Sequence, residues 1–89
     1  LFQVYLLFSE SKNRYYIGYS SNLEARLIRH NQKKKGFTGN TNDWKVVYTE
    51  QYNTKEEAQK RELQIKSWKS RKLMERLIEN SAGLGHPDV

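Results

Sequence analysis

The chain has 89 residues, enough for one compact domain whose core must be thin. Its net charge of +6 favours a polyanionic partner such as DNA, RNA or an anionic membrane surface. It contains no cysteine, so disulfides and thiolate zinc sites are excluded. Residues 1–5 show no basic leader, and no apolar run approaches the roughly 18–20 residues that span a bilayer. We therefore expect a cytoplasmic protein with no membrane association.

Two strands are predicted at the start of the chain. The two-residue alternation of residues 2–8 puts the apolar side chains on one face and Tyr5 on the other. Residues 9–13 are polar and typical of a turn. Residues 14–19 are rich in aromatic residues and predict a second strand. Together these segments indicate an antiparallel hairpin.

A helix is predicted next, with Ser21 as its N-cap, Glu24 completing a capping box and an end near Gln32. A basic, polar loop follows, and residues 44–52 predict a third strand.

A second helix begins with another capping box, Thr54 with Glu57. A third helix carries an amphipathic stripe formed by Leu73, Met74, Leu77 and Ile78. The order β-β-α-β-α-α predicts an α+β domain. We expect the domain to occupy residues 1–80 and a loosely ordered tail to occupy residues 81–89.

Glu62 is the most informative residue of the second helix. Its spacing from Ala58 and Ile65 puts it on the stripe that should face the sheet. A buried carboxylate is costly unless a cation or a proton compensates it. One interpretation is a metal ligand, because Mg²⁺ prefers a carboxylate with several waters. The others are a structural salt bridge to an arginine such as Arg26, or a helix rotated enough to expose the carboxylate.

Arg26 and His30 lie four residues apart on the first helix and share a face at the rim of the core. An arginine and a histidine aimed together can hold a phosphate and exchange a proton. The simpler interpretation is a solvated helix face.

Tyr5 and Tyr16 lie on the predicted strands. Gly18 removes a side chain from the face that carries Tyr16, which either lets a backbone or ligand approach or marks a bulge. We expect one solvent-reachable concavity, with Glu62 on the same side of the sheet as Tyr16, lined by Tyr5, Tyr16, Arg26, His30 and Glu62.

Together these residues resemble the GIY-YIG nuclease family. The first motif appears as Val4-Tyr5-Leu6, which keeps its tyrosine, and the second is intact as Tyr16-Ile17-Gly18. The family's Asn-Leu, Arg-Leu and His-Asn pairs follow as Asn22-Leu23, Arg26-Leu27 and His30-Asn31. Further matches to the small single-domain branch are Val47-Tyr48, Ala58, Arg61-Glu62, Ile65-Lys66 and Trp68-Lys69. The likeness covers residues 4–78, and it extends to the catalytic domains of homing endonucleases and of the excision-repair incision subunit.

The resemblance implies a three-stranded antiparallel sheet flanked by helices. It also implies hydrolysis of a DNA phosphodiester with one divalent metal ion, Mg²⁺ or Mn²⁺. By position, Glu62 would bind the metal and Arg26 would neutralise the scissile phosphate. Tyr5 would activate the attacking water, with its phenolate favoured by Arg26 and the metal, or His30 would take the proton. Tyr16 would complete the site.

The expected partner is DNA, duplex or branched, with Lys33, Lys34 and Lys35 on its backbone phosphates. No separate DNA-binding domain is visible, so we expect weak specificity, or specificity supplied by a partner or a homodimer. The resemblance suggests DNA repair or recombination. Two other classes stay open: a non-catalytic nucleic-acid-binding module with this fold, and a metal-independent interaction protein.

Overall fold

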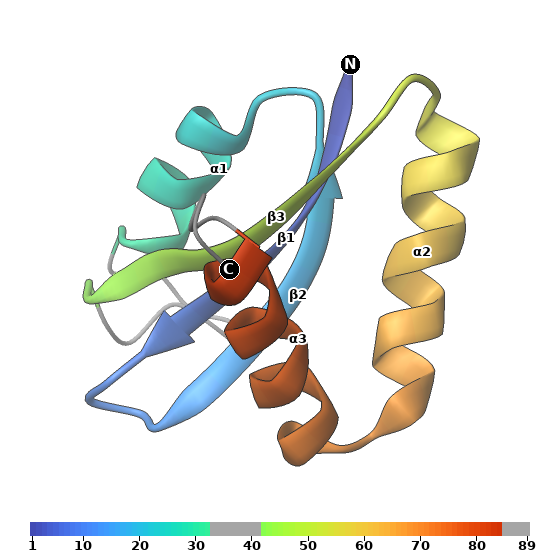
Figure 1. Ribbon diagram of the computed structural model, residues 1–89. Helices are drawn as coiled ribbons and strands as arrows, with labels where there is room; N and C mark the ends of the chain where they lie inside the picture. The colour runs from blue at the N-terminus through green and yellow to red at the C-terminus, as the bar shows by residue number, and fades with distance from the viewer. Residues whose placement is uncertain (33–41, 85–89) are drawn as a thin grey trace.

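The computed structural model describes residues 1–32 and 42–84 of the chain. Its elements, in the expected order, are β1 (Phe2–Ser9), β2 (Arg14–Ser20), α1 (Leu23–His30), β3 (Trp44–Tyr52), α2 (Lys55–Trp68) and α3 (Arg71–Leu84) (Figure 1). The strands form one antiparallel sheet in the order β2-β1-β3, so β1 is central and β2 is an edge strand. The predicted α+β class and its three-stranded sheet are confirmed.

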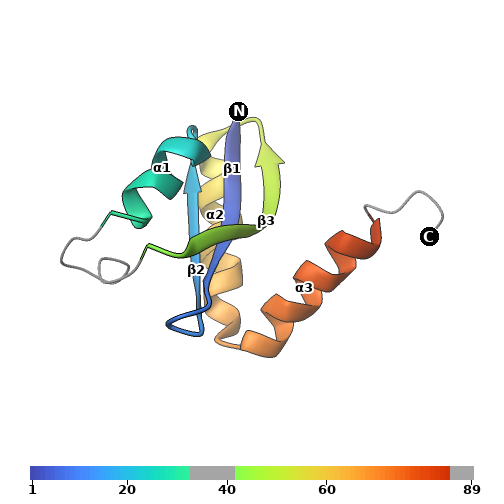
Figure 2. The same ribbon diagram turned by 90° about the vertical axis from the view of Figure 1, so that its left-hand side faces the viewer.

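The helices cover both faces of the sheet, with α1 on one face and α2 on the other (Figures 1 and 2). Under α1, the buried side chains are Tyr5, Leu7 and Trp44. Under α2 and α3, the main core consists of Val4, Leu6, Ala58 and Ile65. The central strand β1 is therefore buried on both faces, with Tyr5 on the α1 side as its parity predicts.

The starts of the helices agree only in part with the sequence. At α1 the N-cap is Asn22, whose Oδ1 accepts a hydrogen bond from the backbone N–H of Ala25 at 3.1 Å. The predicted capping box at Ser21 is therefore wrong: the asparagine one residue later caps equally well. At α2 the predicted cap is confirmed, because Thr54 Oγ1 accepts from the backbone N–H of Glu57 at 3.2 Å.

Asn31 ties the end of α1 to the start of β3. Its Oδ1 accepts from the backbone N–H of Trp44 at 2.7 Å, and its Nδ2 donates to the Trp44 carbonyl at 2.9 Å. This pair of bonds fixes the helix that carries Arg26 and His30 against the sheet. The predicted DNA contacts Lys33, Lys34 and Lys35 lie between these two anchors and outside the described residues.

A polar network on the other face fixes α2. Arg61 donates to both carboxylate oxygens of Glu50, at 2.9 and 3.0 Å, and the hydroxyls of Tyr48 and Tyr52 donate to the same carboxylate. Burial alone would raise the pKa of Glu50, but the bonds from Arg61 and the tyrosines outweigh it and lower that pKa. Arg61 also lies over the Trp68 ring. These contacts fix the rotation of α2, and the burial of Glu62 excludes the interpretation in which its carboxylate is turned out to solvent.

The helix α3 is attached at its first residue. Arg71 donates to the backbone carbonyl and the side-chain oxygen of Asn13 in the β1–β2 turn, and it lies over the rings of Phe8 and Tyr15. The apolar stripe of α3 packs against the main core as predicted. The helix continues to Leu84, past residue 80 where we expect the domain to end, and residues 85–89 lie outside the described residues.

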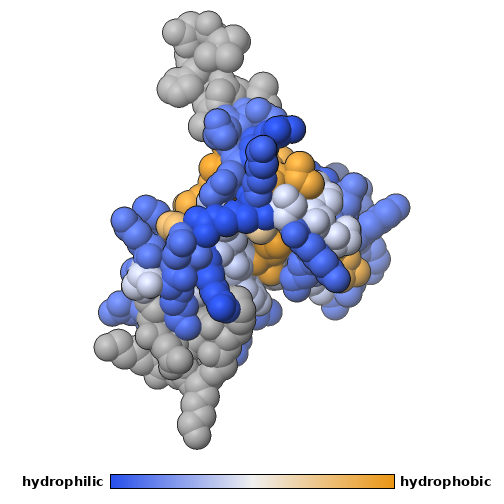
Figure 3. All heavy atoms as spheres, turned by 90° about the horizontal axis from the view of Figure 1, so that it is seen from below, coloured by the Kyte–Doolittle hydropathy of each residue, from blue (hydrophilic) through white to orange (hydrophobic). Residues whose placement is uncertain are grey.

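Among the residues that the structure describes, the exposed large apolar side chains are scattered along the chain: Leu1, Ile28, Leu63 and Leu73. The face seen in Figure 3 is mainly hydrophilic, with small hydrophobic areas between the polar parts. Such a surface suits a charged partner better than an apolar one. In the described part of the chain, the longest helices are too short and too polar to cross a bilayer.

Gly18 makes room for Tyr5. The two residues are paired across β1 and β2, and the register of this pair of strands is regular along its whole length, which excludes a bulge at Gly18. A methyl group at Gly18 would lie 2.6 Å from Tyr5 Oη and 2.8 Å from the carbon that carries it. The Tyr5 ring therefore lies against the backbone of the edge strand. A side chain at position 18 would prevent this close contact.

We expect Gly18→Ala to lower the free energy of unfolding by about 1–3 kcal/mol, because the buried Tyr5 ring must shift to admit the methyl group. In a Tyr5→Phe background the same change should cost less, since the closest contact, the hydroxyl oxygen, is gone. Denaturant titration of the four proteins in this cycle measures the difference. An equal cost in both backgrounds would show that the Tyr5 hydroxyl does not cause the requirement for glycine.

Candidate active site

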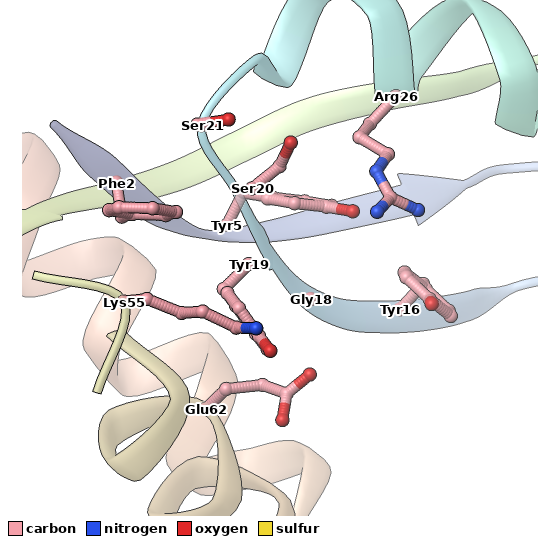
Figure 4. Close-up of a pocket in the computed structure, with 10 residues that line it drawn as sticks. All are labelled: Phe2, Tyr5, Tyr16, Gly18, Tyr19, Ser20, Ser21, Arg26, Lys55 and Glu62. Carbon is pink, nitrogen blue, oxygen red and sulfur yellow. The ribbon is translucent and has the colours of Figure 1, made fainter. Parts of the chain in front are cut away.

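A pocket of about 410 Å³ lies at the β2 edge of the sheet (Figure 4). Both sides of β2 contribute to it, because Tyr16 and Gly18 face α1 whereas Tyr19 packs on the side of α2. The pocket therefore wraps around the edge strand. Its lining residues are Phe2, Tyr5, Tyr16, Gly18, Tyr19, Ser20, Ser21, Arg26, Lys55 and Glu62.

Four of the five residues predicted to converge line this pocket, and they reach it by another route than expected. Tyr5, Tyr16, Arg26 and Glu62 all line the pocket. However, α2 packs on the face opposite to Tyr16, so the expectation that Glu62 lies on the same side of the sheet is wrong. The side chains reach one pocket because β2 is an edge strand of the sheet. Arg26 extends from the α1 side of this strand, and Glu62 extends from its α2 side (Figure 4).

Glu62 is held almost buried, with 9% of the residue exposed. Its Oε2 lies 3.3 Å from Nζ of Lys66, one turn further along α2, whose side chain is about half exposed. The arginine partner considered from the sequence is therefore wrong: Arg61 is bonded to Glu50, and no ion pair joins Arg26 to Glu62 within the described residues. A solvent-exposed lysine on the same helix is an easily displaced partner.

His30 stands behind the two tyrosines and does not line the pocket. Its Nε2 lies 3.4 Å from Tyr5 Oη, and its ring centroid lies 4.4 Å from that of Tyr16. The fifth predicted residue thus reaches the pocket through Tyr5. This arrangement can move a proton from the pocket to His30 through the Tyr5 hydroxyl.

The pKa shifts separate the two candidate bases. Burial raises the pKa of Tyr5 to about 12, and Tyr16 and Glu62 add to this effect, while Arg26 opposes it. Arg26 does favour the Tyr5 phenolate, as expected, but burial outweighs this effect, so in the protein alone the net pKa of Tyr5 is raised. Burial, Arg26 and Arg29 together lower the pKa of His30. His30 is consequently neutral at neutral pH and able to accept a proton.

Lys55 was not predicted from the sequence. It is the first residue of α2, and its side chain extends into the pocket on the Glu62 side of β2 (Figure 4). A usable signal existed, because seven residues separate it from Glu62 and two turns of a helix bring such residues to nearly the same face.

The donor set at the pocket fits a hydrated Mg²⁺ or Mn²⁺ ion. Glu62 is the only carboxylate among the described residues that line it, and the other polar lining groups are tyrosine and serine hydroxyls and the side chains of Arg26 and Lys55. Within residues 1–32 and 42–84, no group of three or more potential His, Cys, Asp or Glu ligands comes together. An ion held by one carboxylate and several waters matches this site, whereas a closed zinc site does not.

Comparison with known proteins identifies the family of this chain. The GIY-YIG catalytic domain model matches residues 1–75. A UPF0213 protein of Staphylococcus saprophyticus is 35% identical over 65 residues, which cover 72% of this chain and 79% of that protein. A UPF0213 protein of Staphylococcus haemolyticus is 38% identical over 68 residues, which cover 75% and 82%. No solved structure gives a significant match. With the family model spanning the sheet, α1, α2 and every predicted site residue, this chain belongs to the GIY-YIG catalytic domain family.

Proposed function

We propose that this domain is a metal-dependent DNA endonuclease or nickase that hydrolyses a phosphodiester bond in the pocket at the β2 edge. The observation that carries the proposal is that Arg26, Tyr5 and Glu62, from three separate elements, line one pocket. An acidic metal ligand, a cation and a proton-accepting path are the groups that this hydrolysis needs. The net charge of +6 supports a polyanionic substrate.

Glu62 would hold the metal ion, and Lys66 would leave the carboxylate when the ion binds. Mg²⁺ or Mn²⁺ bound there supplies a Lewis acid that polarises the phosphoryl oxygen and stabilises the leaving oxygen. Arg26 binds the scissile phosphate and stabilises the charge that grows on it in the transition state. Because Arg26 and Glu62 approach from opposite sides of β2, the phosphate is held between them.

Proton removal from the attacking water runs through Tyr5 to His30. The water gives its proton to Tyr5 Oη as the Tyr5 hydroxyl proton passes to Nε2 of His30, 3.4 Å away. A direct phenolate mechanism is disfavoured, because Tyr5 with a pKa of about 12 is protonated at neutral pH. Tyr16 packs on the His30 ring and keeps Nε2 aimed at Tyr5.

The setting of this activity is also part of the proposal. The substrate is duplex or branched DNA, with Lys33, Lys34 and Lys35 on backbone phosphates and with sequence preference weak or supplied by a partner or a second copy. Repair or recombination of DNA in the cytoplasm of the cell is the corresponding role.

We expect Glu62→Gln to reduce nicking of supercoiled plasmid in Mg²⁺ or Mn²⁺ by orders of magnitude, because the metal loses the one carboxylate that the described residues place in the pocket. Without metal, the melting temperature should stay equal or rise. The lost pair with half-exposed Lys66 is worth only about 0.3–0.5 kcal/mol, and a buried charge is removed.

The matched control is Glu56→Gln, which removes an exposed carboxylate from the same helix and should leave nicking unchanged. Intact nicking in Glu62→Gln, together with a loss of stability of roughly 3–5 kcal/mol, would mean that Glu62 is a structural partner and not a metal ligand. Nicking absent from wild-type protein in either metal would favour the non-catalytic binding module.

The pH dependence tests the proton path. Only neutral His30 accepts a proton, and its pKa lies below 6.5, so the nicking rate should fall only as the pH drops through that lowered pKa. His30→Gln should lose about 10²–10⁴-fold in rate and show no acidic limb. Arg29→Gln, which removes one of the charges that lower the His30 pKa, should move the limb toward pH 6.5. A limb unchanged in His30→Gln would rule out His30 as the acceptor.

A further inference from the structure

A second cavity, the aromatic pocket, lies at the β2 edge and shares a wall with the pocket of the proposed active site. It has a volume of about 260 Å³, and the described residues that line it are Tyr15, Tyr16, Ile17 and Lys66. The shared wall is Tyr16, which lines both cavities. The proposed chemistry takes place in the other pocket and assigns no ligand to this space.

The two cavities differ in chemical character. Three of the four described residues that line the aromatic pocket are aromatic or aliphatic, and none carries a carboxylate. The fourth is Lys66, whose Nζ lies 3.3 Å from Oε2 of Glu62. The ammonium is thus engaged by the carboxylate of the active-site pocket, so Lys66 lies at the boundary between the two cavities. This lining suits an aromatic group that is attached to an anionic one.

The Tyr15 side of the aromatic pocket is fixed before any ligand binds. The ring centroid of Tyr15 lies 4.9 Å from that of Phe8, and the guanidinium carbon of Arg71 lies 5.3 Å from the Tyr15 ring centroid. Arg71 is held in turn by hydrogen bonds to Asn13 and Glu75. A ligand therefore meets a side chain that is already ordered, which lowers the entropic cost of binding.

The backbone of β2 adds hydrogen-bonding groups to this apolar surface. In an antiparallel pair, every second residue directs its N–H and C=O away from its partner strand. Residues 15–17 are consecutive, so their outer side includes such groups, and in the described part of the chain β2 pairs with β1 alone. The outer side of an edge strand can bond to the polar rim of a flat aromatic ligand.

A polynucleotide carries both kinds of group at adjacent positions. Its phosphate would lie in the active-site pocket with Arg26, and the base of the same or the next nucleotide would reach across Tyr16. A base in continuous duplex is stacked on both faces and paired at its edge, so it must leave the helix to enter a pocket. An unpaired base carries no such cost.

We propose that the aromatic pocket binds an unpaired nucleobase of a nucleotide next to the scissile phosphate. The inference rests on the proposed function and narrows its substrate class to DNA that is single-stranded or branched at the point of cleavage. Tyr15 is a specificity-determining residue in this arrangement, because it contacts the base and not the reacting phosphate.

The test compares two fluorescein-labelled duplexes by anisotropy in EDTA, where no cleavage occurs. One carries a single unpaired thymine, and the other carries an abasic residue at the same place, so their charges are equal. Wild-type protein should bind the thymine bulge about 5–150-fold more tightly, the range for one base in contact with aromatic side chains.

Tyr15→Leu should remove this preference, and Tyr15→Phe should keep it, because the ring is retained. The matched control is Tyr52→Leu, which should also keep it. Like Tyr15, Tyr52 is a partly buried strand residue whose hydroxyl interacts with a glutamate, but it lines a different pocket. A preference that survives in Tyr15→Leu would contradict the proposal.

Photocrosslinking gives a measurement that depends on no variant. With 5-iodouracil in place of the unpaired thymine, the crosslinked peptide of the wild-type protein should contain residues 15–17, and a crosslink to any other peptide would contradict the proposal. If wild-type protein shows no base preference but Arg26→Ala weakens binding of both duplexes, the base subsite is wrong and the proposed function stands. If the base preference is absent and Arg26→Ala binds as tightly as wild type, neither pocket binds DNA and both proposals are wrong.

Discussion

The edge position of β2 is the constraint on which the rest of the site depends. In a three-stranded sheet covered on both faces, side chains of α1 and α2 are separated by the sheet everywhere except at its edges. At the β2 edge, only the β2 strand separates the two faces. Gly18 places no side chain on this strand where it lines the pocket. Arg26 and Glu62 can therefore act on one ligand although their helices lie on opposite faces. The small size of the domain is thus part of how the pocket is built.

The position of the Glu62 carboxylate depends on its neighbour Arg61 in α2. Arg61 is bonded to Glu50 through two parallel hydrogen bonds, a geometry that fixes both position and orientation. With that helix face fixed, Glu62 has little freedom to rotate toward solvent and stays at the inner side of the pocket. A buried carboxylate that needs a cation is a cost to the fold. The bonded pair beside it and the apolar stripe formed with Ala58 and Ile65 offset that cost.

Local patterns allowed the elements and most of the site to be predicted from sequence. The spacing of Ala58, Glu62 and Ile65 was enough to place a carboxylate in the core stripe, since helical geometry depends on neighbours only three or four residues apart. The side of the sheet on which α2 packs was beyond reach, because it depends on long-range packing. The cap at Asn22 was missed because adjacent residues, Ser21 and Asn22, both favour that position.

The residues that line the pocket were predicted more completely than the chemistry of their side chains. Proximity of Arg26 to Tyr5 suggested a lowered pKa, but burial acts in the other direction and is larger, and burial cannot be read from a pair of residues. Lys55 was overlooked because the first turn of a helix is usually interpreted through its cap. Its direction toward the pocket follows from the rotation of the whole helix, which the contact between Arg61 and Glu50 sets.

The pair of hydrogen bonds between Asn31 and Trp44 has a consequence for how such domains diversify. These bonds hold the two ends of an intervening segment together, so the rest of the fold does not depend on the length of what lies between them. Each doubling of a loop adds only about 0.6 kcal/mol of closure entropy. Relatives can therefore gain or lose residues there during evolution, changing what the domain contacts beside its pocket while its catalytic scaffold is inherited intact.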